Sequence, residues 1–136
     1  MAINLIDSDD ITVSQSGANI ELNTATSISE IMSEIDNLKP TVLYSNSGGS
    51  DNINLSDSAN NYSRFIINCG IAGTSSYKDF VVENTGTSKI LDIKDGANNG
   101  VGSTLTINGN TMTLTVLYRN YYVTATILIY KVLGFK

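Results

Sequence analysis

The stretch TLTINGNTMTLTVLY, residues 104–118, decides the fold of this chain. Threonine alternates with Leu, Ile, Met or Val on both sides of the pair Asn108-Gly109. Alternation with a period of two predicts half-buried β-strands, and Asn-Gly tolerates the positive φ angles of a tight hairpin turn. We therefore expect an antiparallel hairpin here. The expected apolar face of its second strand consists of Met112, Leu114, Val116 and Tyr118.

Short runs rich in β-branched and aromatic residues continue through residues 41–136, with polar turns between them. Besides the hairpin, the predicted strands are 41–44, 53–55, 64–68, 80–83, 90–93 and 123–133. The polar segments 45–52 and 84–89 predict turns between neighbouring strands, and the apolar run in 64–68 predicts a strand buried on both faces. Roughly seven to nine strands at this spacing predict a mainly β fold, an antiparallel, jelly-roll-like β-sandwich.

Residues 27–39, SISEIMSEIDNLK, predict a short helix. Ser27 and Glu30 have the spacing of a capping box, and Pro40 ends the helix. A helix of this length is marginal alone in water, so its apolar stripe must be buried against its own sheet or against copies of itself. The pattern leaves both open. The stripe occupies heptad positions a, d, a and d with Ile28, Ile31, Ile35 and Leu38, and Met32 widens it.

Residues 1–26 contain two short β-like pieces, 11–13 and 20–22, among Ser, Gly, Asn and Asp. The first ten residues, MAINLIDSDD, have neither a basic region nor a sufficient apolar run for a signal peptide. The chain contains no run of 18 apolar residues, so we expect no membrane insertion. These observations predict a protein made in a cytoplasm without a signal peptide.

Charge and composition exclude several classes of function. The eight Lys and Arg residues are scattered, and the net charge is -5, whereas nucleic-acid binding requires a positive surface. The chain contains no His, which removes Ser-His-Asp and Cys-His catalysis and the commonest zinc ligand. Cys69 is the single cysteine, and we expect it to be a small buried residue. We therefore expect no enzymatic activity and no cofactor.

Aspartates occur in three polar clusters, and carboxylates are calcium ligands. None of the clusters has the spacing of an EF-hand loop, and Asp and Asn also stabilise turns by hydrogen bonding to their own backbone. We therefore expect turn chemistry and no metal site. The clusters comprise Asp7, Asp9 and Asp10, then Asp51 and Asp57, then Asp92 and Asp95.

The segment LYRNYYV joins two predicted strands and is the candidate ligand-binding site. Aromatic rings stack on the apolar faces of sugars while Asn and Arg side chains bond sugar hydroxyls, and Tyr and Arg are also enriched at interface hot spots. The alternative is that the outer tyrosines end strands and pack. The candidate glycan ligands are Tyr118, Arg119, Asn120, Tyr121 and Tyr122.

Two motifs give the chain a family resemblance. Leu43-Tyr44 followed by LSDSANNY at 55–62, and IYKVLGFK at 129–136, form a pattern that resembles the C-terminal head domains of phage virion proteins. These are fibre, baseplate and other minor structural proteins, of receptor-binding type, from phages infecting Gram-positive gut bacteria. The resemblance covers roughly residues 41–136.

That resemblance implies a homotrimeric virion protein that is adhesive rather than catalytic. Its β-head would contact a host cell-surface glycan, residues 27–39 would form a trimerisation stem, and residues 1–26 would attach to other virion proteins. The chain has no long shaft or fibre repeat, which favours a short spike. A capsid head fibre or decoration protein without a receptor, and a carbohydrate-binding module, are the alternatives.

Overall fold

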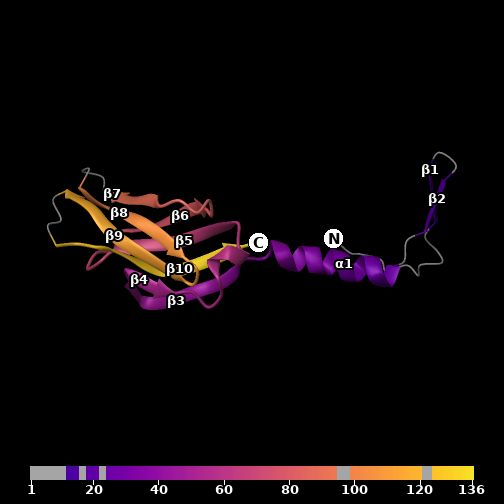
Figure 1. Ribbon diagram of the computed structural model, residues 1–136, viewed down its shortest axis with the longest axis horizontal. Helices are drawn as coiled ribbons and strands as arrows, with labels where there is room; N and C mark the ends of the chain where they lie inside the picture. Colours follow the sequence, from indigo (N-terminus) through magenta and orange to yellow (C-terminus); the bar gives the residue numbers. More distant parts are fainter. Residues whose placement is uncertain (1–11, 16–17, 22–23, 95–98, 121–123) are drawn as a thin grey trace. The chain divides into compact units, whose positions relative to one another are not determined.

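The computed structural model describes residues 12–15, 18–21, 24–94, 99–120 and 124–136, with side chains from residue 28 onward. The chain divides into two units, residues 1–39 and residues 40–136 (Figure 1).

The first unit contains a β-hairpin and a helix. Strands β1 (Thr12–Gln15) and β2 (Ala18–Glu21) pair antiparallel, which agrees with the two predicted β-like pieces, whose outer ends Ile11 and Leu22 lie outside the described residues. Helix α1 spans Thr24–Leu38, so the helix is confirmed. It begins before Ser27, which therefore lies inside the helix. The prediction that Ser27 caps it is wrong, because residues 24–26 also adopt helical geometry.

Residues 40–136 form an antiparallel β-sandwich, which confirms the predicted fold class. One sheet has the strand order β3-β10-β5-β6 and the other β4-β9-β8-β7 (Figure 1). The strands are β3 (Thr41–Ser50), β4 (Asn52–Asn54), β5 (Arg64–Ile71), β6 (Tyr77–Glu83), β7 (Lys89–Lys94), β8 (Gly100–Asn108), β9 (Thr111–Asn120) and β10 (Ile127–Phe135).

The first two strands of the sandwich pair with its last two strands. β3 pairs with β10 and β4 pairs with β9, a nesting that resembles a jelly roll, while β5–β6 and β7–β8 are simple hairpins. The polar segments 45–52 and 84–89 therefore do not connect strands that pair with each other. They carry the chain from one sheet to the other, because the strands on either side of each segment find their partners elsewhere in the sequence.

The glycine-rich part of segment 45–52 forms a bulge inside β3. Ser45 pairs with Lys131 and Ser50 pairs with Ile129, so residues 46–49 lie opposite Tyr130 alone. The Asn46 Oδ1 atom accepts a hydrogen bond from the backbone N–H of Gly48 at 2.8 Å. The predicted turn chemistry is therefore present, but within a strand.

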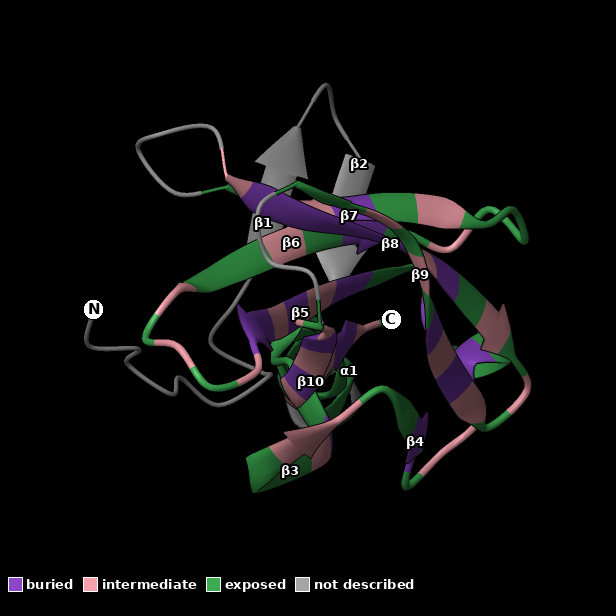
Figure 2. Cartoon of the chain, turned by 90° about the vertical axis from the view of Figure 1, so that its left-hand side faces the viewer, coloured by how far each residue is buried: buried purple, intermediate pink, exposed green. Residues whose placement is uncertain are grey.

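The core lies between the two sheets and alternates along each strand. Phe65, Ile67 and Cys69 of β5 are fully buried, whereas Ile66 and Asn68 between them are half-exposed. Burial of β5 on both faces was therefore a wrong prediction, because a two-layer sandwich covers only one face of each sheet. Figure 2 shows the same alternation along β9 and β10. Cys69 is buried as predicted, and desolvation raises the pKa of its thiol to about 12.

The hairpin between β8 and β9 confirms the Asn-Gly prediction, with its turn moved by one residue. Asn108 pairs with Thr111, so the two loop residues are Gly109 and Asn110. Gly109 has a φ angle of 56°, in the left-handed region that glycine adopts most easily. The alternation then propagates from a fixed turn, which places Met112 in the core.

A β-bulge interrupts this alternation near the end of β9. Val116 pairs with Ser103 and Tyr118 pairs with Gly102, which leaves Leu117 as an extra residue. Ser103 faces the core, whereas Gly102 belongs to the outer face of the sheet. Tyr118 therefore lies on the outer face, and its predicted place on the same face as Met112 is wrong.

The motif LSDSANNY forms a compact corner before β5, built around Asp57. Its Oδ1 atom accepts hydrogen bonds from the backbone N–H of Ser58 at 2.7 Å and from Asn61 Nδ2 at 3.0 Å. Its Oδ2 atom accepts from the hydroxyl of Tyr62 at 3.1 Å. The hydrogen bonds from Asn61, Ser58 and Tyr62 lower the pKa of the Asp57 carboxyl below its usual 3.8.

Tyr62 connects this corner to the last strand. Its side chain is buried, and a Cβ atom placed on Gly134 would lie 2.6 Å from both Tyr62 Cδ1 and Leu43 Cδ1. The next residue, Ser63, donates its backbone N–H to the carbonyl of Phe135 at 2.8 Å. The two sequence motifs that carry the resemblance therefore contact each other, although they lie far apart in the chain.

We predict that Gly134→Ala destabilises the head domain. The new methyl group would overlap Tyr62 and Leu43, and overpacking of this kind costs about 1–3 kcal/mol. Urea denaturation monitored by tyrosine fluorescence measures the change in the free energy of unfolding. Gly48→Ala is the matched control, because its Cβ would meet only Asn46 Oδ1 at 3.4 Å and neither glycine has a positive φ angle. Equal losses of stability in both variants would contradict the close packing at Gly134.

Candidate functional site

The predicted ligand-binding segment begins at the end of β9, on the outer face of the second sheet. Three of its five candidate residues are described: Tyr118 is half-buried, and Arg119 and Asn120 are exposed. Tyr121 and Tyr122 lie outside the described residues. The side chains beside Tyr118 and Asn120 come from β7 and β8, the two strands next to β9 in this sheet.

Asp92, Gly102 and Tyr118 form one row across the three strands β7, β8 and β9. The ring of Tyr118 lies across Gly102, where any Cβ atom would overlap it. The Tyr118 hydroxyl thereby reaches past β8 and donates a hydrogen bond to Asp92 Oδ1. A glycine on the central strand is thus what allows a side chain of β9 to bond a side chain of β7.

Lys94, Gly100 and Asn120 form the next row on the same face. The Lys94 Nζ atom lies 3.4 Å from Asp92 Oδ2, and the side-chain stem of Lys94 leans over Gly100, whose Cβ would be 2.9 Å from Lys94 Cγ. The two rows together form a small polar surface, which we call the Asp92–Tyr118 cluster. It consists of Asp92, Lys94, Tyr118 and Asn120, arranged over Gly100 and Gly102.

The cluster is suited to hydrogen bonding rather than to proton transfer. The hydrogen bond to the Asp92 carboxylate, and then desolvation, raise the pKa of Tyr118 to about 12. A general acid or base works best when its pKa lies near the operating pH, so Tyr118 does not meet that condition near neutrality. An ammonium group, a carboxylate, an amide and a phenol ring side by side can bond the hydroxyls of a polar ligand.

Arg119 also makes a hydrogen bond within the head domain. Its Nε atom donates a hydrogen bond to the carbonyl of Ala125 at 2.7 Å, which links the end of β9 to the residues before β10. This contact occupies one edge of the guanidinium group. Tyr118 packs on its own sheet, as the alternative to ligand binding supposed for the outer tyrosines, and Arg119 is exposed.

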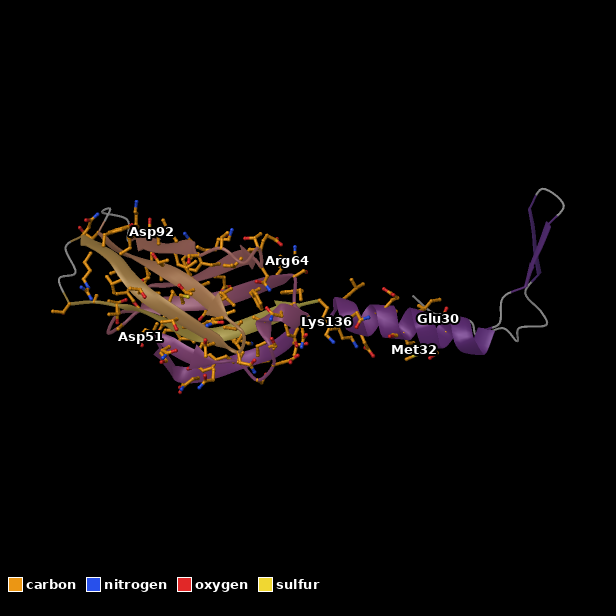
Figure 3. All side chains as sticks on the ribbon, in the orientation of Figure 1. Glu30, Met32, Asp51, Arg64, Asp92 and Lys136 are labelled. Carbon is orange, nitrogen blue, oxygen red and sulfur yellow. The ribbon has the colours of Figure 1, made fainter. Side chains whose placement is uncertain are left out.

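The Asp92–Tyr118 cluster lies at one end of the sandwich. Figure 3 labels Asp92 near one end of the head domain and Arg64 near the other. Arg64 pairs with Phe135, and Thr41 pairs with Gly134, so the first and last residues of the head lie together at the end away from Asp92. The cluster therefore lies at the end of the sandwich away from Thr41, where the head begins in sequence after the helix.

The predicted oligomerisation residues lie along one apolar face of α1. Ile31, Met32, Ile35 and Leu38 are between 46% and 77% exposed, and Ile28 is half-exposed. Glu30 and Met32 point to different sides of the helix in Figure 3. Apolar side chains of this size at heptad spacing are typical of a helix face that packs against another apolar surface.

The structure also locates some of the aspartates considered as metal ligands. Within the described part of the chain, no three His, Cys, Asp or Glu side chains gather closely enough to hold a metal ion. Asp57 and Asp92 are engaged in the hydrogen bonds given above, while Asp7, Asp9, Asp10 and Asp95 lie outside the described residues. Among the described helices, none has the length and apolarity to cross a membrane.

Comparison with known proteins gave no match to a family model, to a curated protein or to a solved structure. Sequence reasoning identified Tyr118 and Asn120 but missed Asp92 and Lys94 as their neighbours. The available signal was the pair Gly100 and Gly102, because two glycines at alternate positions leave one face of a strand bare.

We predict an alkaline pH dependence that belongs to Tyr118. Its pKa is 10.0 in a model compound and about 12 in the folded chain, so the unfolded chain releases the proton first. Stability is therefore lost as the pH rises from about 10 to about 12, and Tyr118→Phe should remove that part of the loss. Urea denaturation at several alkaline pH values measures the difference between the two proteins.

Gly102→Ala supplies the geometric control for this prediction. The new methyl group displaces the Tyr118 ring and breaks its bond to Asp92, which should return the pKa of Tyr118 toward 10. Ultraviolet absorbance titration, with the Tyr118→Phe variant subtracted, isolates this one residue. A Tyr118 that titrates at its ordinary pKa in the unmodified chain would contradict the hydrogen bond to Asp92.

Proposed function

We propose that the chain is a non-enzymatic structural protein that assembles as a homotrimer through α1 and presents the β-sandwich as its head. The observation that carries this proposal is the exposed apolar face of α1. Burial of a large aliphatic side chain contributes about 1.5–3 kcal/mol, so a helix with several such side chains in water gains much by association.

The heptad pattern favours three copies. Ile28 and Ile35 occupy a positions and Ile31 occupies a d position, and Ile at both kinds of position favours trimers over dimers. Helix α1 has 15 residues, a length at which an isolated helix is marginal in water. Association would stabilise the helix and bury its face in one step.

We further propose that this trimer is a phage virion component, a short fibre or spike. This part rests on the resemblance of residues 41–136 to virion head domains, and its support is the corner in which the two motifs meet. Tyr62 of the first motif packs on Gly134 of the second, so the residues of the two motifs form one packed corner rather than separate surface segments. Residues 1–26 would then attach the trimer to other virion proteins.

Replacing Ile31 and Ile35 together by Asp should convert the trimer to a monomer. Six charges per trimer seam cannot be buried without partners, so the stem would dissociate while the head stays folded. Multi-angle light scattering gives the mass, and circular dichroism reports the β-structure of the head. The matched control replaces Ser29 and Ser33, which occupy outward heptad positions, by Asp. A monomeric mass for the unmodified chain would contradict the proposed trimer.

The Asp92–Tyr118 cluster is the proposed contact with a host-surface glycan. Its position at the end of the sandwich away from Thr41 is the one expected for the tip of a fibre. Binding on a glycan array should fall at least several-fold in Lys94→Ala and in Asn120→Ala, because each removes a donor from the cluster. Ser45→Ala, on the other sheet, is the control. A folded trimer that binds no glycan would favour the alternative of a decoration protein. A monomer that binds glycan would favour the alternative of a carbohydrate-binding module.

A further inference from the structure

Four aliphatic residues lie in one row across the outer face of the first sheet. Val42 of β3 pairs with Leu133 of β10, which pairs in turn with Ile66 of β5. Ile66 pairs with Val81 of β6. Val42 and Val81, at the two edges of the sheet, are 52% and 66% exposed. The row therefore presents a continuous apolar band from one edge strand to the other.

The neighbouring row is polar and lies beside an open hollow of about 240 Å³. Lys131 of β10, Asn68 of β5 and Asp79 of β6 form this row, and Asn68 Nδ2 donates a hydrogen bond to Asp79 Oδ1 at 2.7 Å. Ile66 and Leu133 of the apolar row complete the lining of the hollow. The face thus offers both an apolar band and a recess.

Charges of opposite sign occupy different strands of this face. The cations are on the two central strands, Arg64 on β5 and Lys131 on β10, and the anions Asp79 and Glu83 are on the edge strand β6. Each cation shares a row with one anion. Arg64 pairs directly with Glu83. Lys131 and Asp79 both pair with Asn68, from its two sides. Among the described residues, Lys131 and Glu83 make no ion pair within the chain.

We propose that this face packs against further copies of the same chain, with the β6 half of one copy against the β3–β10 half of the next. The inference rests on the proposed trimer and assigns it a second interface, in the head. A ring of three copies requires such a heterologous contact, in which two different halves of one surface meet.

The rows match each other under this arrangement. Rotation about an axis parallel to the strands keeps every residue at its own level, so each row of one copy meets the same row of the next. Val81 then meets Leu133 and Val42, which buries apolar surface against apolar surface. Asp79 meets Lys131 at the polar row. Like charges do not face each other in the apolar row or in the polar row.

The connection between the helix and the head supports the same partner. Only Lys39 and Pro40 separate the end of α1 at Leu38 from the start of β3 at Thr41. Three chain steps span at most about 11 Å, so a parallel bundle of helices holds the three β3 strands close together. Val42, the second residue of β3, belongs to the apolar row. The apolar band therefore begins at the point where copies are brought together.

A cysteine pair tests the arrangement directly in the full chain. Asp79→Cys and Lys131→Cys lie two strands apart, roughly 10 Å, which is beyond the reach of a disulfide within one copy. Mild oxidation should therefore link copies, and a non-reducing gel should show a ladder that ends at the covalent trimer. Each single variant should give no linked trimer, because closing the ring needs both cysteines.

The matched control is the pair Ile90→Cys and Thr115→Cys, which has the same two-strand spacing on the outer face of the other sheet. Contact at an interface raises the effective concentration, so linked trimer should exceed that of the control roughly tenfold or more. A trimer by light scattering without this ladder, or a ladder that continues beyond three copies, would overturn the head interface and leave the stem intact. A monomeric mass by light scattering would contradict both the head interface and the proposed function.

Discussion

The contact between Tyr62 and Gly134 is the constraint on which the head domain depends. Asp57 holds the Tyr62 hydroxyl, and the bare backbone of Gly134 lets the ring lie against the last strand. The same corner donates the backbone N–H of Ala59 to the carbonyl of Gly109, in the β8–β9 turn of the other sheet. One buried ring and its carboxylate therefore connect the end of the chain, the start of β5 and the central hairpin.

Glycine on a central strand serves the same purpose in both sheets. Gly102 lets Tyr118 reach Asp92 across β8, and Gly70 lies beneath Tyr77 and Tyr130, whose rings meet edge to face at 5.2 Å. Each glycine removes a Cβ atom where an aromatic ring from a neighbouring strand lies on the outer face. Large rings can then cover a sheet that has no second layer above it, and they do so at positions that alternation alone would assign to polar residues.

The proposed trimer involves two apolar surfaces of this chain. The face of α1 and the row from Val42 to Val81 are both exposed, and Lys39 and Pro40 alone separate the elements that carry them. In the proposed trimer, association in parallel register would bury both. The polar Asp92–Tyr118 cluster lies at the other end of the sandwich, where it stays accessible in such an assembly.

The sequence by itself determined the local structure: a helix from its heptad stripe, a hairpin from Asn108-Gly109, and a buried Cys69 in an apolar strand. These features depend on neighbours within a few residues, which is why periodicity and turn chemistry predict them. Only the tertiary structure decided which strand pairs with which, because pairing of β3 with β10 joins residues from opposite ends of the domain. It also placed Tyr118 on the outer face, since the bulge at Leu117 shifts the register so that Tyr118 pairs with Gly102. The position of Asp92 beside Tyr118 followed from that pairing, and no local pattern contains it.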